Sequence, residues 1–291
     1  MRSSRVLIPE ELSFAANLSI LFADLPLLQR PGAAAAAGFT AVESWWPFAT
    51  AVPTTGEVDG FVAALADAGV RLVALNLFAG DMPAGERGLV SLPGRRQEFR
   101  RSLGALVTIA ERTGCRAFNA LYGQRVAGVD PKAQDRLAVE NLAVAAAAVA
   151  PLEGVLLVEP LAHGENGAYP LLTAADAVAV VHRVRREANV TNIRFLADLY
   201  HLASNGEALA AVLPRHARET GHVQIADVPG RHQPGTGGLD FEHLFALLAS
   251  TGYRGHVGLE YRPLGPPELS FDWLPVARRA SSDALGGGGA R

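Results

Sequence analysis

Three features of the sequence predict a single-domain α/β fold of the (β/α)8 TIM barrel class. Eight short apolar segments alternate with longer Ala- and Leu-rich segments of helical character, and such alternation over about 250 residues is typical of a parallel barrel. No linker rich in Pro, Ser or Gly divides the chain. The competing doubly wound sheet would require a glycine-rich phosphate-binding turn after its first strand, and none follows residues 14–18.

The expected strands are apolar runs rich in Val, Ile and Leu, each followed by loop-like sequence. They lie at 14–18, 40–44, 71–77, 116–121, 154–159, 192–198, 221–226 and 255–260. Helices are expected between them, at 25–37, 57–68, 95–113, 132–150, 173–188, 206–213 and 241–251. Thr173 and Pro131 stand where helices should begin, and Gly114 follows a helical run as a left-handed C-cap does.

The predicted barrel domain occupies residues 13–275, between two terminal segments. An N-terminal extension comprises residues 1–12, and a C-terminal tail comprises residues 276–291. The tail contains the sequence ALGGGGAR, which is flexible by composition.

Composition argues against several classes of function. The net charge of −3 is spread along 291 residues with no basic stripe, so nucleic acid is not an expected partner. The sequence has no run of about 18 apolar residues that would span a membrane, and its start does not resemble a secretory signal, so we expect a cytoplasmic protein. One cysteine, Cys115, excludes an internal disulfide. Lys132 is the only lysine and stands in loop-like sequence, which argues against Schiff-base catalysis.

Four strand segments in the second half of the chain end in a residue that can bind a metal through oxygen. Glu159, Asp198, Gln224 and Glu260 stand in VLLVEP, IRFLADLYH, GHVQIAD and HVGLEYR. They are 39, 26 and 36 residues apart, close to one strand-plus-helix unit of roughly 30 or more residues. Because side chains alternate along a strand, all four should project inward at the top of the barrel.

The chemistry of these four residues indicates a metal site. Three carboxylates in an apolar interior are costly unless a cation neutralises them, and an oxygen-rich set favours Mg²⁺ or Mn²⁺ over Zn²⁺. The alternative is that each acid caps a strand end or forms a surface ion pair. His222, two residues before Gln224, should pack lower in the barrel as a core histidine. Three long segments also follow strands and so lie on the same face, at 78–94, 160–172 and 227–239.

Other residues near the strand ends are candidates for substrate binding. His201 lies three residues beyond Asp198 and could donate to a substrate oxygen or cap the loop. Arg231 stands in a loop above the ligands, where its planar donor fork would suit a carboxylate, with a solvated surface position as the alternative. Glu43 and Asn76, at or near the ends of the second and third strands, are expected to contact substrate as well.

Longer stretches of the sequence resemble a known family. The segments FAANLSILF, GFTAVESWWPF, LNLFAGDMPAGERGL, VEPL, ADLYH, GHVQIADVPGRHQPGTG and GLEYRP are similar to the hydroxypyruvate isomerase family, within the xylose-isomerase-like TIM barrel superfamily. The resemblance covers about residues 13–263. It implies a metal-dependent isomerase of the aldose–ketose type, acting on a small hydroxylated keto acid, and a homo-oligomer.

The resemblance also implies roles for the strand-end residues. The metal ligands of the family correspond to Glu159, Asp198, Gln224 and Glu260, and two of these, Glu159 and Glu260, correspond to its acid/base pair. The implied reaction interconverts hydroxypyruvate and tartronate semialdehyde through an enediolate, by moving a proton between adjacent carbons.

Departures from the family pattern leave alternatives open. Gly238 and Ala162 stand where the family commonly carries Glu and Asn, so the exact substrate is not settled by the sequence. The alternatives are an isomerase of a four-carbon 2-oxo acid such as 2-oxotetronate, a ketose 3-epimerase, and a non-catalytic metabolite-binding barrel. Gln224 favours the hydroxypyruvate branch because the epimerases usually carry His there. Intact Glu159 and Glu260 argue against a non-catalytic barrel.

Overall fold

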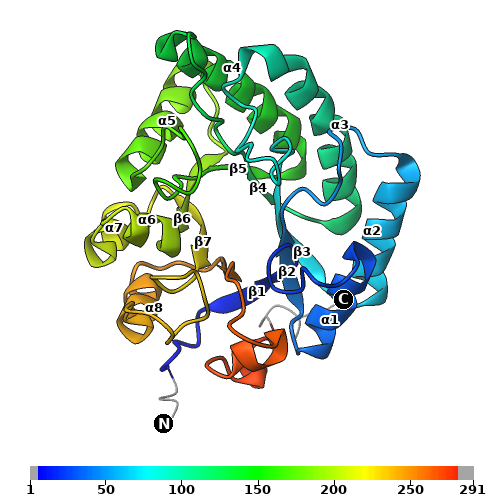
Figure 1. The fold of residues 1–291 in the computed structure, drawn as a ribbon, viewed down its shortest axis with the longest axis vertical. Helices are drawn as coiled ribbons and strands as arrows, with labels where there is room; N and C mark the ends of the chain where they lie inside the picture. Colours follow the sequence, from blue (N-terminus) through cyan, green and yellow to red (C-terminus); the bar gives the residue numbers. More distant parts are fainter. Residues whose placement is uncertain (1–5, 281–291) are drawn as a thin grey trace, which may run out of the picture.

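The computed structural model describes residues 6–280 and contains eight parallel strands closed into one barrel (Figure 1). The strands are β1 (Ser13–Asn17), β2 (Ala41–Ser44), β3 (Arg71–Asn76), β4 (Ala117–Asn119), β5 (Val155–Val158), β6 (Ile193–Asp198), β7 (Thr220–Ile225) and β8 (His256–Leu259). Each strand pairs with the next along the chain, and β8 pairs with β1, where Ser13 lies opposite His256. The predicted TIM barrel is confirmed, and its closure leaves the sheet without a free edge.

Helices form an outer ring around the strands (Figure 1). They are α1 (Arg30–Ala36), α2 (Thr55–Asp67), α3 (Arg96–Thr113), α4 (Pro131–Val149), α5 (Ala174–Ala188), α6 (Leu199–Ser204), α7 (Leu209–Arg215) and α8 (Phe241–Ser250). Helix α6 has no counterpart among the expected helices. It begins directly after β6 because the Asp198 carboxylate accepts a hydrogen bond from the backbone N–H of Tyr200 (2.8 Å) and caps the helix.

The capping residues singled out in the sequence do cap helices. At α5 the Thr173 hydroxyl accepts from the N–H of Asp176 (3.1 Å), and the Asp176 carboxylate accepts from the N–H of Thr173 (2.9 Å), which is a capping box. Pro131 is the first residue of α4. Gly114 ends α3 with a φ of 74°, a left-handed conformation that favours glycine.

The eighth position of the outer ring is filled by 3-10 turns. After β8 the chain forms η4 (Pro267–Phe271) and η5 (Val276–Arg278), in the segment that lies between α8 and α1 in Figure 1. Phe271 is fully buried and packs edge-on against Phe39, with ring centroids 5.0 Å apart. This aromatic contact takes the place of a helix in closing the outer ring.

Residues 276–280, at the start of the expected C-terminal tail, pack against the beginning of the chain. The Arg278 guanidinium donates to the backbone carbonyls of Pro9 (2.6 Å) and Leu12 (2.9 Å). The arginine thereby ties residues 276–280 to the segment that leads into β1. The remaining parts of the two expected terminal segments, residues 1–5 and 281–291, lie outside the described residues.

One glycine makes room in the layer below the barrel mouth. Gly258 on β8 lies opposite Gln224 on β7. A Cβ atom at this position would lie 2.3 to 2.5 Å from the carboxyl atoms of Glu43, well inside van der Waals contact. The missing side chain therefore leaves the space that the Glu43 carboxylate occupies.

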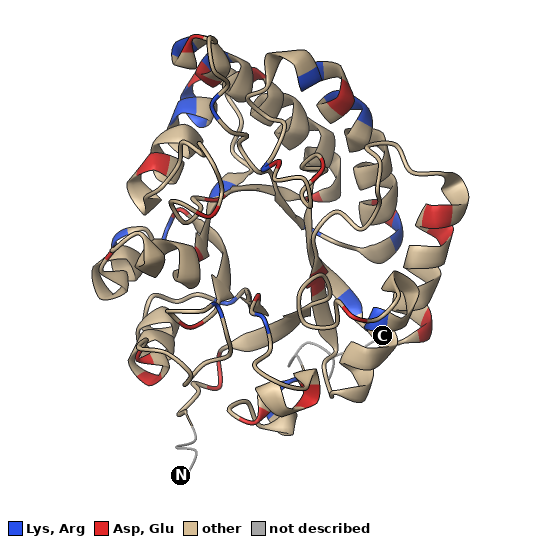
Figure 2. Ribbon diagram, in the orientation of Figure 1, with Lys and Arg blue, Asp and Glu red and all other residues tan. Residues whose placement is uncertain are grey.

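Charged residues of both signs are interspersed on the outer helices and also occur near the barrel opening (Figure 2). Across the part of the chain that the structure describes, no helix combines the length and apolar character needed to cross a membrane.

Replacing Gly258 with alanine should destabilise the barrel. The new methyl group would overlap the Glu43 carboxyl group, which hydrogen bonds hold in place, and overpacking of this kind costs roughly 1–3 kcal/mol. Urea titration should show a fall of that size in the free energy of unfolding. Gly104→Ala on α3 is the matched control, because no neighbouring atom among the described residues lies within 4 Å of its added Cβ. It should gain up to ~1 kcal/mol, and equal stability of the two variants would contradict the packing argument.

Candidate active site

A polar side chain stands at or near the C-terminal end of every strand. From β1 to β8 these residues are Asn17, Glu43, Asn76, Asn119, Glu159, Asp198, Gln224 and Glu260, each at most 7% exposed. Because the strands are parallel and the barrel is closed, their ends surround one small space. The four residues predicted as metal ligands all belong to this ring.

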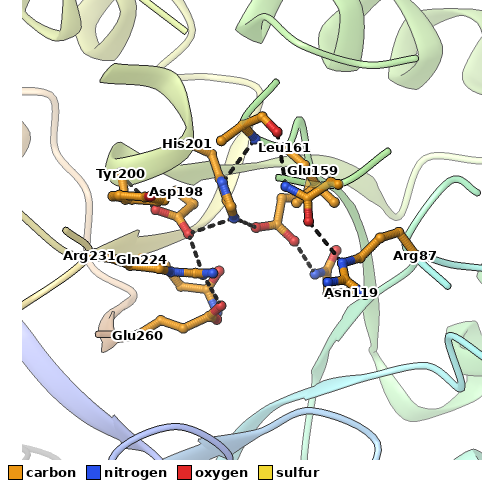
Figure 3. A network of polar contacts seen from close by, with 12 residues as sticks. Arg87, Asn119, Glu159, Leu161, Asp198, Tyr200, His201, Gln224, Arg231 and Glu260 are labelled. Carbon is orange, nitrogen blue, oxygen red and sulfur yellow. Dashed lines mark hydrogen bonds and ion pairs between the residues drawn. The ribbon is translucent and has the colours of Figure 1, made fainter. Parts of the chain in front are cut away.

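The predicted ligands form two contact groups (Figure 3). In the first, Glu159 and Asp198 lie with His201, and one ligand atom from each lies within 4.8 Å of the others. In the second, Nε2 of Gln224 donates to Oε2 of Glu260 at 2.5 Å. The first group is buried, and its two carboxylates could hold a metal ion.

The guanidinium of Arg231 joins the two groups. Its Nη2 donates to Oε1 of Glu260 at 2.5 Å and lies 3.4 Å from Oδ2 of Asp198. It also lies over the ring of Tyr200, 5.1 Å from the centroid. Arg231 therefore reaches the site, as predicted from its loop, but its charge is directed at two of the acids.

Burial makes these acids hard to ionise. Burial and the negative charges of Glu260 and Asp198 raise the pKa of Glu159 well above its ordinary value. Burial also raises the pKa of Asp198, and it raises that of Glu260 to about 8 although the charge of Arg231 opposes the shift. One guanidinium cannot neutralise three carboxylates, so the ionised cluster has excess negative charge that a divalent cation would offset.

The oxygen atoms of the ring suit such a cation. Oε1 of Gln224 is buried and has no hydrogen-bond partner among the described residues, because the amide nitrogen of the same side chain donates to Glu43 and Glu260. A buried oxygen without a donor is free to bind a metal ion. With the carboxylates beside it, this amide oxygen completes a set of hard ligands.

His201 is arranged as a hydrogen-bond donor. Its Nδ1 accepts from the backbone N–H of Ala162 (3.0 Å), so the neutral ring carries its proton on Nε2. Nε2 lies 3.5 Å from Oδ2 of Asp198 and 3.9 Å from Oε1 of Glu159. Burial and two nearby arginines lower the pKa of His201 well below its ordinary value, which keeps the ring neutral. A protonated Nε2 can donate to an oxygen and cannot bind a metal.

Glu43 lies below the opening and does not form its wall. Its carboxylate accepts from Nδ2 of Asn17 (2.9 Å) and Nε2 of Gln224 (2.8 Å), and it lies 2.6 Å from Nε2 of His222. His222 is buried, as expected for a core histidine. Glu43 was expected to contact substrate. Its carboxylate instead occupies the space beside Gly258, where it accepts a hydrogen bond from Gln224 and orients that side chain.

A cavity of about 1280 Å³ opens above the ring. Glu159, Glu260, His201, Arg231 and Asn76 line it, so both glutamates and three of the four expected substrate contacts face one space. Asp198 is 1% exposed and contacts the lining residues from behind. The cavity is also lined by Trp45, Trp46, Phe78, Arg87 and Tyr200.

Comparison with known proteins identifies the family. Residues 31–275 match the family described as xylose isomerase-like TIM barrel. A protein of Streptomyces coelicolor named putative hydroxypyruvate isomerase is 53% identical over 271 residues, which cover 92% of this chain and 97% of that protein. The chain belongs to the hydroxypyruvate isomerase family.

Other relatives carry related names. The hydroxypyruvate isomerase of Escherichia coli (strain K12) is 33% identical, with 92% of this chain and 100% of that protein covered. The 2-oxo-tetronate isomerase of Cupriavidus necator is 35% identical, with 90% and 96% covered. Among solved structures, one described as AP endonuclease, family 2, from Brucella melitensis is similar with a TM-score of 0.82. It is 37% identical, with 90% of this chain and 97% of that chain covered.

In this member of the hydroxypyruvate isomerase family, amides hold both glutamates. Nδ2 of Asn119 donates to Oε2 of Glu159 (2.6 Å), and Nδ2 of Asn17 donates to Oε2 of Glu260 (3.2 Å). The sequence-based prediction assigned neither asparagine to the site. Both stand at the ends of strands in the first half of the chain, so applying the strand-end rule to all eight strands would have found them.

The loop that carries Arg231 is built around one buried carboxylate. Asp227, 0% exposed, accepts hydrogen bonds of 2.8 to 3.0 Å from four backbone N–H groups of the same loop. The donors are Val228, Gly235, Gly237 and Leu239. Arg231 itself has a φ of 59°, an unfavourable backbone conformation for a residue with a side chain. The bonds to Asp227 hold the loop, and with it Arg231, over the acids.

Replacing Asp227 with asparagine should loosen this loop and destabilise the protein. The asparagine amide group would face backbone N–H donors, so two hydrogen bonds are lost and donors oppose each other, at a cost of roughly 2–5 kcal/mol. Urea unfolding should show that loss, and hydrogen exchange should speed up at 228–239. Asp240→Asn is the control, since Asp240 only caps α8 and asparagine caps equally well. Similar effects of both substitutions would count against the role of Asp227.

Proposed function

We propose that this chain is a hydroxypyruvate isomerase, which interconverts hydroxypyruvate and tartronate semialdehyde. The observation that carries the proposal is the pair Glu159 and Glu260, two buried glutamates from β5 and β8 that line one cavity together with His201 and Arg231. The names of the relatives and the family membership support the same reaction.

A divalent cation, Mg²⁺ or Mn²⁺, completes the proposed site. Glu159, Asp198, Gln224 and Glu260 would hold it, as the unpaired amide oxygen of Gln224 and the excess negative charge support. When bound, it would supply positive charge that stabilises the negative charge developing on the substrate oxygens.

The two glutamates transfer the proton. One of them removes a proton from C3 of hydroxypyruvate, the electron pair of that C–H bond forms a C2–C3 double bond, and the π pair of the C2 carbonyl moves onto its oxygen to give an enediolate. The other delivers a proton to C2, which leaves an aldehyde at C3, while the hydroxyl proton passes from the C3 oxygen to the C2 oxygen. Asn119 and Asn17 hold the two carboxylates in place during these steps.

Three further residues orient the substrate in this proposal. His201 donates from Nε2 to a substrate oxygen, because its Nδ1 is already engaged by Ala162. Asn76 lines the cavity and offers an amide. Arg231 places positive charge beside Glu260, where it stabilises the substrate oxygen that becomes negative when the C3 proton is removed.

A second candidate is isomerisation of a four-carbon 2-oxo acid. The 2-oxo-tetronate isomerase of Cupriavidus necator supports it through 35% identity over most of both chains. The cavity of about 1280 Å³ has room for one more hydroxylated carbon. Relative kcat/KM values for hydroxypyruvate and 2-oxotetronate decide between the two candidates.

Glu159→Gln and Glu260→Gln should each abolish isomerisation while the fold is kept. Glutamine has the shape of glutamate but cannot accept the substrate proton, and loss of a general acid or base costs about 10²- to 10⁴-fold. Turnover of hydroxypyruvate and exchange of its C3 hydrogen in deuterated water measure the effect. Glu98→Gln is the control, because Glu98 also lines the cavity but pairs with Arg95. Unchanged turnover in both glutamate variants would sink the mechanism.

Mg²⁺ or Mn²⁺ should stabilise the chelator-treated protein against heat. Binding to the folded state at 100 times Kd adds about 2.7 kcal/mol, which is a rise in Tm of roughly 5–10 °C for a domain of this size. Differential scanning calorimetry with and without each ion measures the shift. Asp198→Asn should lose most of it, and Asp240→Asn should retain it. No shift with either ion would argue against a metal at the four strand ends.

A further inference from the structure

Five arginines line the cavity, and among the residues that the structure describes only one of them is partly buried, forms no ion pair and keeps a terminal nitrogen without an acceptor. Arg231 contacts Asp198 and Glu260, and Arg95 pairs with Glu86 and Glu98. Arg262 is exposed to solvent. Arg30 donates to three backbone carbonyls, and the charge of Asp24 opposes the lowering of its pKa by burial. The fifth is Arg87, in the loop after β3.

The guanidinium of Arg87 is fixed by neutral groups alone. Its Nε donates to Oδ1 of Asn166 (2.8 Å), and its Nη1 donates to the backbone carbonyls of Met82 (2.9 Å) and Glu86 (2.8 Å). Within residues 6–280 no carboxylate forms an ion pair with it, and Nη2 has no acceptor. Burial and the positive charge of Arg231 lower the pKa of Arg87. The protein thus holds a half-buried cation whose charge it does not neutralise.

The backbone around Arg87 holds it beside the site. The carbonyl of Arg87 accepts from the N–H of Gly123 (3.1 Å) in the loop after β4. The next residue, Gly88, has a φ of 101°, and a Cβ there would lie 2.0 Å from the carbonyl oxygen of Leu121, so only glycine allows this close approach. The backbone at Arg87 therefore lies in close contact with the loop after β4.

Hydrogen bonds connect Arg87 to the catalytic ring. Asn166, which accepts from Arg87, donates to the carbonyl of Ala162 (3.0 Å), and the N–H of Ala162 donates to His201. In Figure 3, Arg87 and Arg231 approach the acids from opposite sides. The positive charges of both arginines act on His201. One side of the site thus carries a neutralised guanidinium and the other an unneutralised one.

We propose that Arg87 binds the carboxylate of the substrate and restricts the site to 2-oxo acids, while Arg231 remains on the opposite side with Asp198 and Glu260. This assignment rests on the proposed function. A carboxylate would neutralise Arg87 and accept a hydrogen bond from its free Nη2. Asn76 lines the same cavity on β3, and its amide has no hydrogen-bond partner within the described chain, so it can supply a second donor. A neutral sugar or ketose would leave the Arg87 charge uncompensated.

Arg87→Gln should remove the preference for an acid. Turnover is measured on hydroxypyruvate and on dihydroxyacetone, in which a CH2OH group replaces the carboxylate. For hydroxypyruvate, KM should rise about 10- to 100-fold with a much smaller change in kcat, because the carboxylate is bound alike in the ground state and the transition state. Turnover of dihydroxyacetone should stay within about threefold. Arg87→Lys keeps the charge without the fork and should lose less.

Arg95→Gln is the matched control. It removes the same charge from the same cavity, but from an arginine that already pairs with two acids. Its ratio of kcat/KM for the two substrates should stay within about threefold of the wild-type ratio. An unchanged ratio in Arg87→Gln, or an equal change in Arg95→Gln, would overturn the assignment.

A binding measurement separates this assignment from the proposed function. D-glycerate has the carboxylate but no carbonyl to isomerise, and calorimetry with Mg²⁺ present gives its Kd. Arg87→Gln should weaken glycerate binding about 10- to 100-fold, and Arg95→Gln should not. If the wild-type protein turns over neither 2-oxo acid, the proposed function fails, yet glycerate binding still tests Arg87. If turnover is present and glycerate binds equally to both variants, only the Arg87 assignment fails.

Discussion

The negative charge buried at the mouth of the barrel is the constraint on which the rest of the site depends. Carboxylates from β2, β5, β6 and β8 stand within a ring of residues that are almost wholly buried, and such an arrangement is stable only if the charge is shared or neutralised. Several neighbouring groups share or neutralise this negative charge. Asparagine and glutamine amides donate to the acids, His222 pairs with Glu43, and Arg231 reaches down from a loop to contact two of them. The same excess of charge makes the ring suitable for a divalent cation.

The alternation of strand and helix segments was enough to predict the fold. The alternation of side chains along each strand was enough to predict where the acids lie. In a closed barrel of parallel strands all C-terminal ends lie at one mouth, so Glu159, Asp198, Gln224 and Glu260 had to come close together there once the barrel closed. Helix starts could also be predicted, because the residues that cap a helix lie close together in the sequence, as in the Thr173 capping box. Helix α6 was not anticipated, because its first turn is capped by Asp198, a residue that the sequence had marked as a metal ligand.

Contacts between residues far apart in the sequence, and the conformations of loops, could not be predicted from sequence patterns. Glu43 was expected to contact substrate, and its lower position depends on a missing side chain at Gly258, more than 200 residues away. The four backbone bonds to Asp227 and the neutral anchors of Arg87 arise from loop conformations that no periodicity encodes. In the sequence, Arg87 and Arg231 are both loop arginines. Only the structure shows that Arg231 is paired with acids, whereas Arg87 has no ion pair within residues 6–280.

The ring of eight strand-end residues is unevenly divided along the chain. The acids proposed to hold the metal and move the proton come from β5 to β8, whereas β1 to β4 supply three amides, Glu43 and the loop that carries Arg87. The residues proposed to bind the metal and move the proton would then be inherited through the second half of the gene, and the arginine proposed to bind the substrate carboxylate through the first. Substitutions in the first half, or its exchange between relatives, could change which acid is accepted. The second half would stay under selection for the residues that carry out the reaction. A barrel divided in this way gives evolution a means of diversifying substrates without rebuilding catalysis.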